Sequence, residues 1–203
     1  MAKTWDDFLP LANPHLPGCP DATIRTYLAS TASTFFARTY LWREQIDAVY
    51  TANNQVEYDL DADTGIIEDI IGVVYNEQQL VRTDIRFVGV ERLSERGEPR
   101  EYWIQADQTL RIFPIPESRA ALKVYAVLKP SRSGTGVEDW IYETWADTLV
   151  SGTIYQLANT PDKEWSNPQL ANMHGQLYEN AINKARVRDT RGVRMAVKQR
   201  PAA

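Results

Sequence analysis

The residue types that most often catalyse reactions or bind metals are sparse in this sequence. The only histidines are His15 and His174, and neither has a second histidine, a cysteine or a carboxylate at ligand spacing. A metal site or a proton relay takes several such groups together. We therefore expect ordinary surface or packing roles for both histidines, and we assign no catalytic and no metal-binding residue.

An acidic segment, Asp59–Gly65, begins like a calcium-binding loop, with carboxylates at positions one, three and five. Its glycine falls at position seven, where such a loop requires it at six. Ile70 stands where a bidentate glutamate is needed. Solvated turn residues are the expected interpretation, and a cation site is the alternative. If the protein were an enzyme of unrecognised type, the acidic residues to inspect would be Glu57, Asp59 and Asp61.

Two further patterns carry no chemistry. The segment 133–136, Ser-Gly-Thr-Gly, has the small residues of a phosphate loop but lacks the lysine that should follow, so a flexible linker is expected. Adjacent acids such as Glu68 and Asp69 have no enclosing apolar context, so a glycosidase-like pair cannot be argued. No cofactor is expected, and the protein is not expected to be an enzyme.

Composition describes an ordinary globular chain of 203 residues, 43% hydrophobic and 24% charged. A single cysteine, Cys19, excludes an internal disulfide. There is no apolar run of membrane-spanning length and no apolar signal segment at the N-terminus, so we expect a protein made and kept in a cytoplasm.

Charge is unevenly distributed along the chain. Beyond position 183, seven basic residues oppose one acidic residue, a net charge of +6, whereas the first 183 residues carry 15 basic and 26 acidic residues, a net charge of −11. A basic tail on an acidic body suggests a segment that binds an acidic surface. The tail residues expected to do so are Arg191, Arg194, Lys198 and Arg200.

Aromatic residues are numerous, with six tryptophans and ten tyrosines, and the tryptophans fall largely at the ends of expected elements. They either close the rims of the core or form subunit contacts, where tryptophan and tyrosine supply large rigid areas, and both roles are compatible. The subunit-contact candidates are Trp103, Trp140 and Trp165.

These residues must be positioned by elements that the sequence pattern predicts. A proline-rich turn at 14–20 ends a short first helix, after which Asp21 is expected to cap a helix of about 23 residues. Its apolar face should be buried, because apolar residues recur at steps of three and four. That face comprises Ile24, Leu28, Thr31, Phe35, Thr39 and Trp42.

The middle of the chain changes to the pattern of strands. Residues 49–50 and 56–60 alternate around Asn53-Asn54 and predict two strands joined by a turn. Further strands are expected at 66–75, 102–104, 109–113 and 122–128, the last with one solvated face, while 83–92 fits a helix as well as a strand.

Helical periodicity returns after residue 136. One helix is apolar over much of its circumference, and Asn167-Pro168 predicts the start of another, whose buried stripe should be Leu170, Met173, Leu177 and Ala181, with Gly192 as a stop. The order helices, strands, helices predicts an α+β fold, because neither end can bury its stripe alone. We expect a helical bundle from residues 1–45 and 137–190, a small antiparallel β-domain inserted at 46–136, and a basic tail at 191–203.

The chain resembles the head-to-tail connector, or adaptor, proteins of tailed bacteriophages. The resemblance begins with Trp5-Asp6-Asp7-Phe8-Leu9-Pro10, the turn at 14–20 and a helix ending near 39–42. It continues through the strands 110–116 and 122–128, the 128–131 segment that follows, and the final helix pair joined by 161–168. It covers most of the chain but includes no catalytic signature.

This resemblance implies a twelve-subunit ring beneath the portal at one capsid vertex, which extends the DNA channel and offers a platform to the next tail component. The partners implied are the portal protein, a downstream tail or stopper protein, further copies of the chain and passing DNA. The C-terminal segment of this family commonly reaches along the portal, and here that segment is basic. The alternative from another class is a DNA-binding protein acting through its basic tail.

Overall fold

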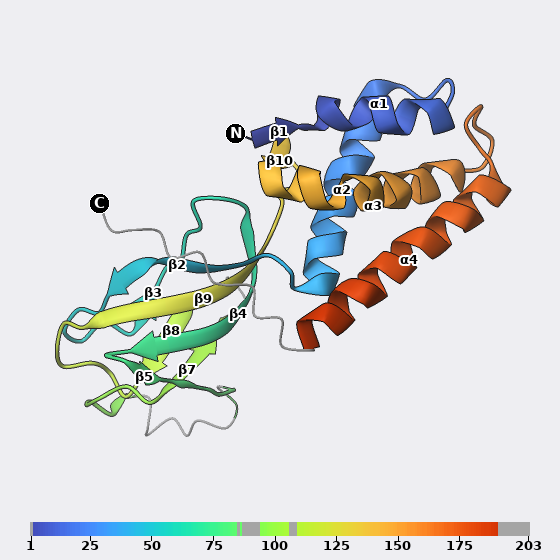
Figure 1. The fold of residues 1–203 in the computed structure, drawn as a ribbon. Helices are drawn as coiled ribbons and strands as arrows, with labels where there is room; N and C mark the ends of the chain where they lie inside the picture. The colour runs from blue at the N-terminus through green and yellow to red at the C-terminus, as the bar shows by residue number, and fades with distance from the viewer. Residues whose placement is uncertain (1, 85, 87–93, 106–108, 191–203) are drawn as a thin grey trace. The chain divides into compact units, whose positions relative to one another are not determined.

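The computed structural model describes residues 2–84, 86, 94–105 and 109–190 (Figure 1). This part of the chain contains both helices and β-sheets, which confirms the α+β class. It divides into two compact units, one formed by residues up to Leu41 together with those from Lys129 onward, and the other by Trp42–Leu128. None of the described helices has the length and apolarity needed to cross a bilayer.

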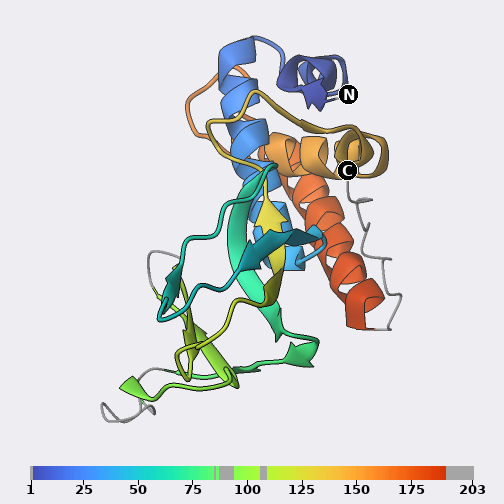
Figure 2. The same ribbon diagram turned by 90° about the vertical axis from the view of Figure 1, so that its left-hand side faces the viewer.

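The first unit contains the helices and a short two-stranded sheet (Figures 1 and 2). Its elements are β1 (Ala2–Thr4), the 3₁₀ turn η1 (Trp5–Phe8), α1 (Leu9–Ala12), the 3₁₀ turn η2 (Asn13–His15), α2 (Asp21–Thr39), β10 (Gly136–Glu138), α3 (Asp139–Ala158) and α4 (Pro168–Thr190).

Helix α2 differs from the expected helix at both ends. Asp21 is its first residue and not its cap, because Pro20 occupies the cap position and no side chain caps the helix. The Asp21 carboxylate still lies in the first turn, where it interacts favourably with the positive end of the helix dipole. The helix ends at Thr39, since Tyr40 adopts a left-handed φ of 56° and donates its N–H to Phe36 O at 3.0 Å. Trp42 therefore lies outside this helix.

The predicted face of α2 is buried, and Phe35 is at its centre. Phe35 is fully buried, and its ring lies 5.0 Å from that of Trp145 on α3 and 6.2 Å from that of Tyr178 on α4. The Tyr178 hydroxyl donates to Thr31 O at 3.3 Å, and burial raises the pKa of Tyr178 to about 12. Side chains of α2, α3 and α4 thus meet in one core.

Helix α4 starts as predicted but buries a different face. The Leu170 N–H donates to Asn167 Oδ1 at 3.1 Å, so Asn167 caps the helix and Pro168 takes its first position. The predicted stripe is wrong, because Met173 and Leu177 are 50% and 52% exposed. Each buried residue from Ala171 to Ile182 stands one position after a residue of the predicted stripe. Successive residues on a helix are 100° apart around its axis, so the buried face is rotated by about 100° from the predicted one. The buried residues are Ala171, His174, Tyr178, Ile182 and Ala185.

A strand pair at the N-terminus was not expected from the sequence. β1 and β10 pair antiparallel, with Lys3 opposite Val137 and Thr4 opposite Gly136. A side chain at Gly136 would overlap the backbone of Lys3, so glycine permits this close approach. The last residue of the expected flexible linker is therefore part of a paired strand.

The second unit contains two four-stranded sheets. Their strand orders are β2-β9-β4-β5 and β3-β8-β7-β6. The strands are β2 (Arg43–Tyr50), β3 (Glu57–Tyr58), β4 (Ile66–Tyr75), β5 (Gln78–Gln79), β6 (Val81–Arg82), β7 (Glu101–Ile104), β8 (Leu110–Phe113) and β9 (Ala121–Lys129).

The described strand positions agree largely with the sequence pattern, but their pairing does not. A turn forms around Asn54, which has a φ of 64°, yet the strands on either side of it join different sheets: β2 pairs with β9, and β3 pairs with β8. β6 pairs parallel with β7, so the second sheet is not purely antiparallel. Most of the uncertain segment 83–92, the predicted stop at Gly192 and the tail 191–203 lie outside the described residues.

Candidate functional site

The two histidines, distant in sequence, meet in the helical unit. The ring of His15, on η2, lies 5.2 Å from the ring of His174, on α4. His174 is 7% exposed, and neither of its ring nitrogens has a hydrogen-bond partner within the described residues. Burial and, next, the neighbouring His15 lower the pKa of His174. His174 is thus a buried, neutral packing residue at pH 7.

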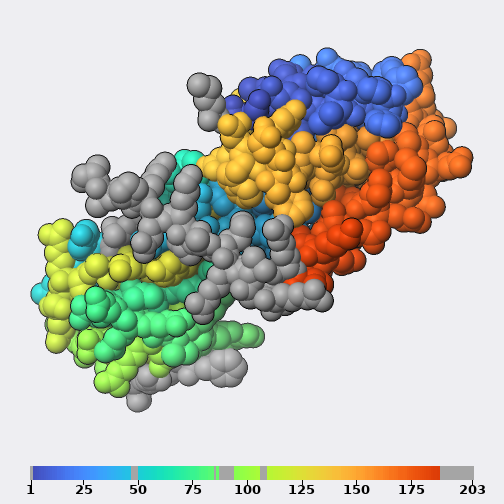
Figure 3. All heavy atoms as spheres, in the orientation of Figure 1, coloured from blue at the N-terminus to red at the C-terminus, as the bar shows by residue number. Residues whose placement is uncertain are grey.

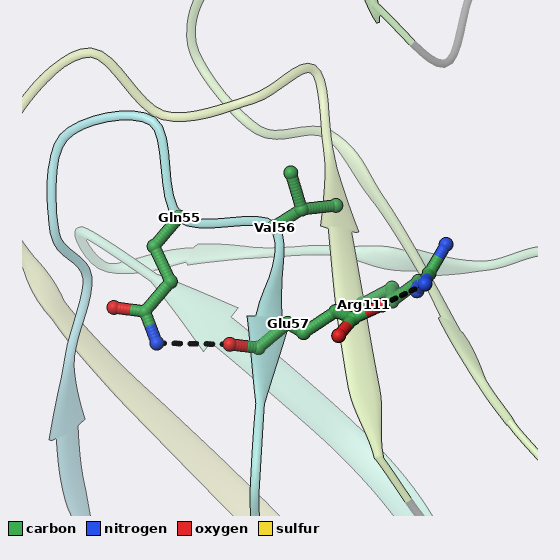
Figure 4. Close-up of a pocket in the computed structure, with 4 residues that line it drawn as sticks. All are labelled: Gln55, Val56, Glu57 and Arg111. Carbon is green, nitrogen blue, oxygen red and sulfur yellow. Dashed lines mark hydrogen bonds and ion pairs between the residues drawn. The ribbon is translucent and has the colours of Figure 1, made fainter.

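Among the described acidic residues of the second unit, Glu57 lies beside a basic partner. Figure 4 shows a shallow hollow lined by Gln55, Val56, Glu57 and Arg111. The Glu57 carboxylate forms an ion pair with Arg111, and Gln55 Nε2 donates to the Glu57 carbonyl at 2.9 Å. The Glu57 carboxylate is thus held by its basic neighbour.

Metal-binding geometry is also absent from the part of the chain that the structure describes. No three histidine, cysteine, aspartate or glutamate side chains in it are arranged to hold a metal ion. Asp59 and Asp61, from the segment that resembled a calcium loop, are exposed. The interpretation of this segment as solvated turn residues stays a prediction.

The three tryptophans proposed for subunit contact lie in different environments. Trp103 is buried, 3% exposed, beneath the Arg111 guanidinium and beside Phe113. Trp140 is half-buried, and its Nε1 donates to Glu138 at 2.7 Å. Trp165 is half-buried in the connection between α3 and α4, and its Nε1 has no partner among the described residues. Trp140 and Trp165 present more surface to a neighbour than Trp103 does.

The Trp-x-x-Phe motif at residues 5–8 binds the segment that directly precedes β10 and α3. Trp5 Nε1 donates to Gly134 O at 2.6 Å, and the Trp5 N–H donates to Thr135 O at 3.2 Å. Phe8 is fully buried against the Tyr142 ring at 4.9 Å. Trp5 and Phe8 therefore have a structural role, and both belong to the N-terminal segment on which the adaptor resemblance rests.

A family model for the SU10 adaptor protein matches residues 3–200. The chain belongs to the SU10 adaptor protein family. This confirms the resemblance to the phage adaptor proteins, and it places the chain in a structural family, generally without enzymatic activity. A search of curated proteins found no match.

Arg191, Arg194, Lys198 and Arg200, expected to bind the portal, lie outside the described residues. The exposed Met173 and Leu177 were assigned to the core by the sequence pattern, so this surface was missed. The sequence contained one signal for this exposed surface. Helix α4 carries more apolar residues than a single stripe holds, and Tyr178 and Ile182 define a second stripe.

Proposed function

We propose that this member of the SU10 adaptor protein family is the head-to-tail adaptor of a tailed bacteriophage. Copies of the chain form a twelve-subunit ring beneath the portal, extend the DNA channel and provide the platform for a downstream tail or stopper protein. The match to the family over residues 3–200 is the observation that carries this proposal.

The proposed subunit is a helical bundle with an inserted β-domain. The bundle comprises residues 1–45 and 137–190, and the β-domain comprises residues 46–136. Contacts of α2 with both α3 and α4 support a bundle made from the two ends of the chain. Trp140 and Trp165, both half-buried, remain candidates for contact with a neighbouring subunit.

Charge supports separate roles for body and tail. The net charge of +6 beyond residue 183 suits a segment that binds an acidic surface of the portal protein. The net charge of −11 on the rest of the chain suits a channel through which DNA passes without sequence-specific binding. The assembled ring would then lie in the virion neck, at the head-tail junction, after assembly in the host cytoplasm.

Native mass spectrometry tests the proposal directly. The purified 23.1 kDa chain is measured alone and after mixing with the portal ring from the same genome. We expect the monomer to disappear into a portal complex that carries twelve copies. A chain that stays monomeric beside an intact portal ring would contradict the adaptor role.

The basic tail also favours a second candidate, a DNA-binding protein. Such binding would rest on phosphate contacts, so the affinity for free duplex DNA would fall steeply between low and physiological salt. Fluorescence anisotropy with the purified chain measures this. Salt-dependent DNA binding without portal binding would favour this candidate over the adaptor.

A further inference from the structure

Helix α4 has an apolar face that no described part of the helical unit covers. Met173 and Leu177 are 50% and 52% exposed, and Leu170 is half-buried one turn before Met173. At 100° per residue, the exposed Lys184 falls between Met173 and Leu177 around the helix axis. Figure 3 shows α4, in orange to red, at the surface of this unit. We call Leu170, Met173, Leu177, Asn180 and Lys184 the α4 stripe.

The composition of the α4 stripe indicates a protein partner. Between residues 168 and 183 the only charged residue is Glu179, and it pairs with Arg38 at 2.6 Å. The exposed polar residues of this stretch are mostly asparagine and glutamine. Exposed methionine and leucine, few charges and flanking amides are typical of the centre of a protein interface, and they are unsuited to binding DNA phosphates.

Helix α3 carries a second row of residues at four-residue steps, three of them exposed and Ser151 half-buried. We call Glu143, Asp147, Ser151 and Tyr155 the α3 row. Glu143 and Asp147 are exposed and have no ion-pair partner among the described residues. Tyr155 is 39% exposed. Side chains at four-residue steps form a ridge on a helix surface, so these four can contact one neighbouring helix.

The α4 stripe lies on the side of α4 that points away from α3 of its own chain. Gly175 of α4 faces the Tyr155 ring, because a side chain placed at Gly175 would meet that ring within 2.8 Å. Met173 is two residues from Gly175 and therefore lies 200° around the helix, on the far side of α4. A contact between the α4 stripe and the α3 row thus requires two copies. Because the surfaces differ, the contact is head-to-tail, the kind that closes rings.

Spacing and charge fit when the two helices run antiparallel. From Asp147 to Tyr155 is eight residues, about 12 Å, and from Lys184 back to Leu177 is seven, about 10.5 Å. Antiparallel packing that pairs Lys184 with Asp147 then brings Tyr155 beside Leu177 and Met173. Opposite charges meet at one end, and an aromatic ring meets a thioether and an aliphatic side chain at the other.

We propose that the α4 stripe of one copy packs antiparallel against the α3 row of the next copy. This contact deepens the proposed function, on which it rests, by naming the surfaces through which adjacent ring subunits bind. A stable interface buries roughly 800 Å² on each partner, so the helix pair forms the centre of the contact and neighbouring segments add to it.

Cysteine cross-linking tests the contact and preserves the charged residues. In a Cys19→Ser background, Ser151→Cys and Asn180→Cys are made in separate chains, one helical turn from Asp147 and Lys184. We expect a mixture of the two variants to form a disulfide-linked dimer, in solution or on the portal ring, and a double variant to form a ladder of multimers. Each variant alone should stay uncross-linked, because its cysteine then faces a native residue.

Charge reversal tests the pairing itself. Lys184→Glu should weaken subunit association roughly threefold to tenfold in analytical ultracentrifugation, and Asp147→Lys in the same chain should restore it. The matched control is Lys163→Glu, which changes the net charge equally at an exposed position in the connection between α3 and α4. Its association should equal that of the unmodified chain.

Several outcomes would overturn the contact. Rings that carry the cysteine pair but never cross-link would refute it and leave the adaptor role intact. Cross-linking by Asn180→Cys alone would mean that α4 packs against α4 of the partner. Loss of portal binding in Leu177→Ser, with subunit association unchanged, would assign the α4 stripe to the portal. If no copies assemble with or without the portal, the proposed function fails, and the contact fails with it.

Discussion

His174 is a buried histidine whose protonation the fold opposes. Its ring nitrogens are shielded from water, and the ring of His15 lies 5.2 Å away. The pKa of His174 in the folded state lies below its ordinary value of 6.5. As the pH falls, His174 therefore binds a proton in the unfolded chain before it does so in the folded protein. The contribution of the neutral His174 to stability is complete above pH 6.5 and is lost as the pH falls below it.

Replacing His174 with leucine should flatten this pH dependence. We expect the free energy of unfolding of the unmodified chain to fall more between pH 7.5 and 5.5 than that of His174→Leu. Urea unfolding at several pH values measures both. Equal slopes for the two proteins would show that His174 does not titrate on unfolding in this range.

Phe35 should be among the most costly side chains to shorten. It is fully buried and contacts the rings of Phe36, Trp145 and Tyr178. Phe35→Ala should lower the free energy of unfolding by about 3–5 kcal/mol, because it removes a large apolar side chain and leaves a cavity. Chemical denaturation gives the value, and a loss below about 1 kcal/mol would contradict this packing.

At the scale of elements, α4 has two apolar faces, and only one of them belongs to the core. Its buried face includes Tyr178 and Ile182, whereas Met173 and Leu177 are exposed. Local periodicity detects both faces equally well, since each repeats at steps of three and four. Contact with α2 and α3 selects the buried one.

Two alanine substitutions on α4 should separate its faces. Ile182→Ala should cost about 2–5 kcal/mol of unfolding free energy, because Ile182 is fully buried. Leu177→Ala should change it by less than about 0.5 kcal/mol in the isolated chain. Thermal and urea unfolding of the pair provide the comparison. The opposite ranking would mean that the predicted stripe, Leu170 to Ala181, is the buried one after all.

The β1–β10 pair is a second feature decided at this scale. Three residues at the N-terminus, Ala2–Thr4, are too few for alternation to predict a strand. They form one because the backbone of Gly136–Glu138 supplies hydrogen-bonding partners for a strand. Trp5 adds a hydrogen bond to Gly134, two residues before that strand. The opening Trp-x-x-Phe motif thus stabilises a long-range contact and not only its own helix.

At the scale of the whole molecule, we expect folding and portal binding to depend on different parts of the chain. The buried core residues of the described chain extend to Ala185, and the basic residues Arg191, Arg194, Lys198 and Arg200 follow later in the sequence. A protein truncated after Asp189 should therefore keep its fold but lose portal binding. Circular dichroism reports the fold, and co-sedimentation with the portal ring reports binding. Undiminished binding by the truncated chain would refute the role of the tail.

Family membership and the α+β class followed from the sequence alone. The turn at 14–20, the Asn167-Pro168 cap and the alternating strand around Val124 were also predicted correctly, because each depends on residues within a few positions of one another. The same local patterns located most strands of the second unit.

Tertiary structure alone decided which elements meet. It paired β2 with β9 and β3 with β8, where the sequence suggested a hairpin, and it brought His15 to His174. It also turned Met173 and Leu177 outward. Local periodicity sets the type of an element, but the partner of a face or strand depends on contacts between distant residues, which no short pattern contains.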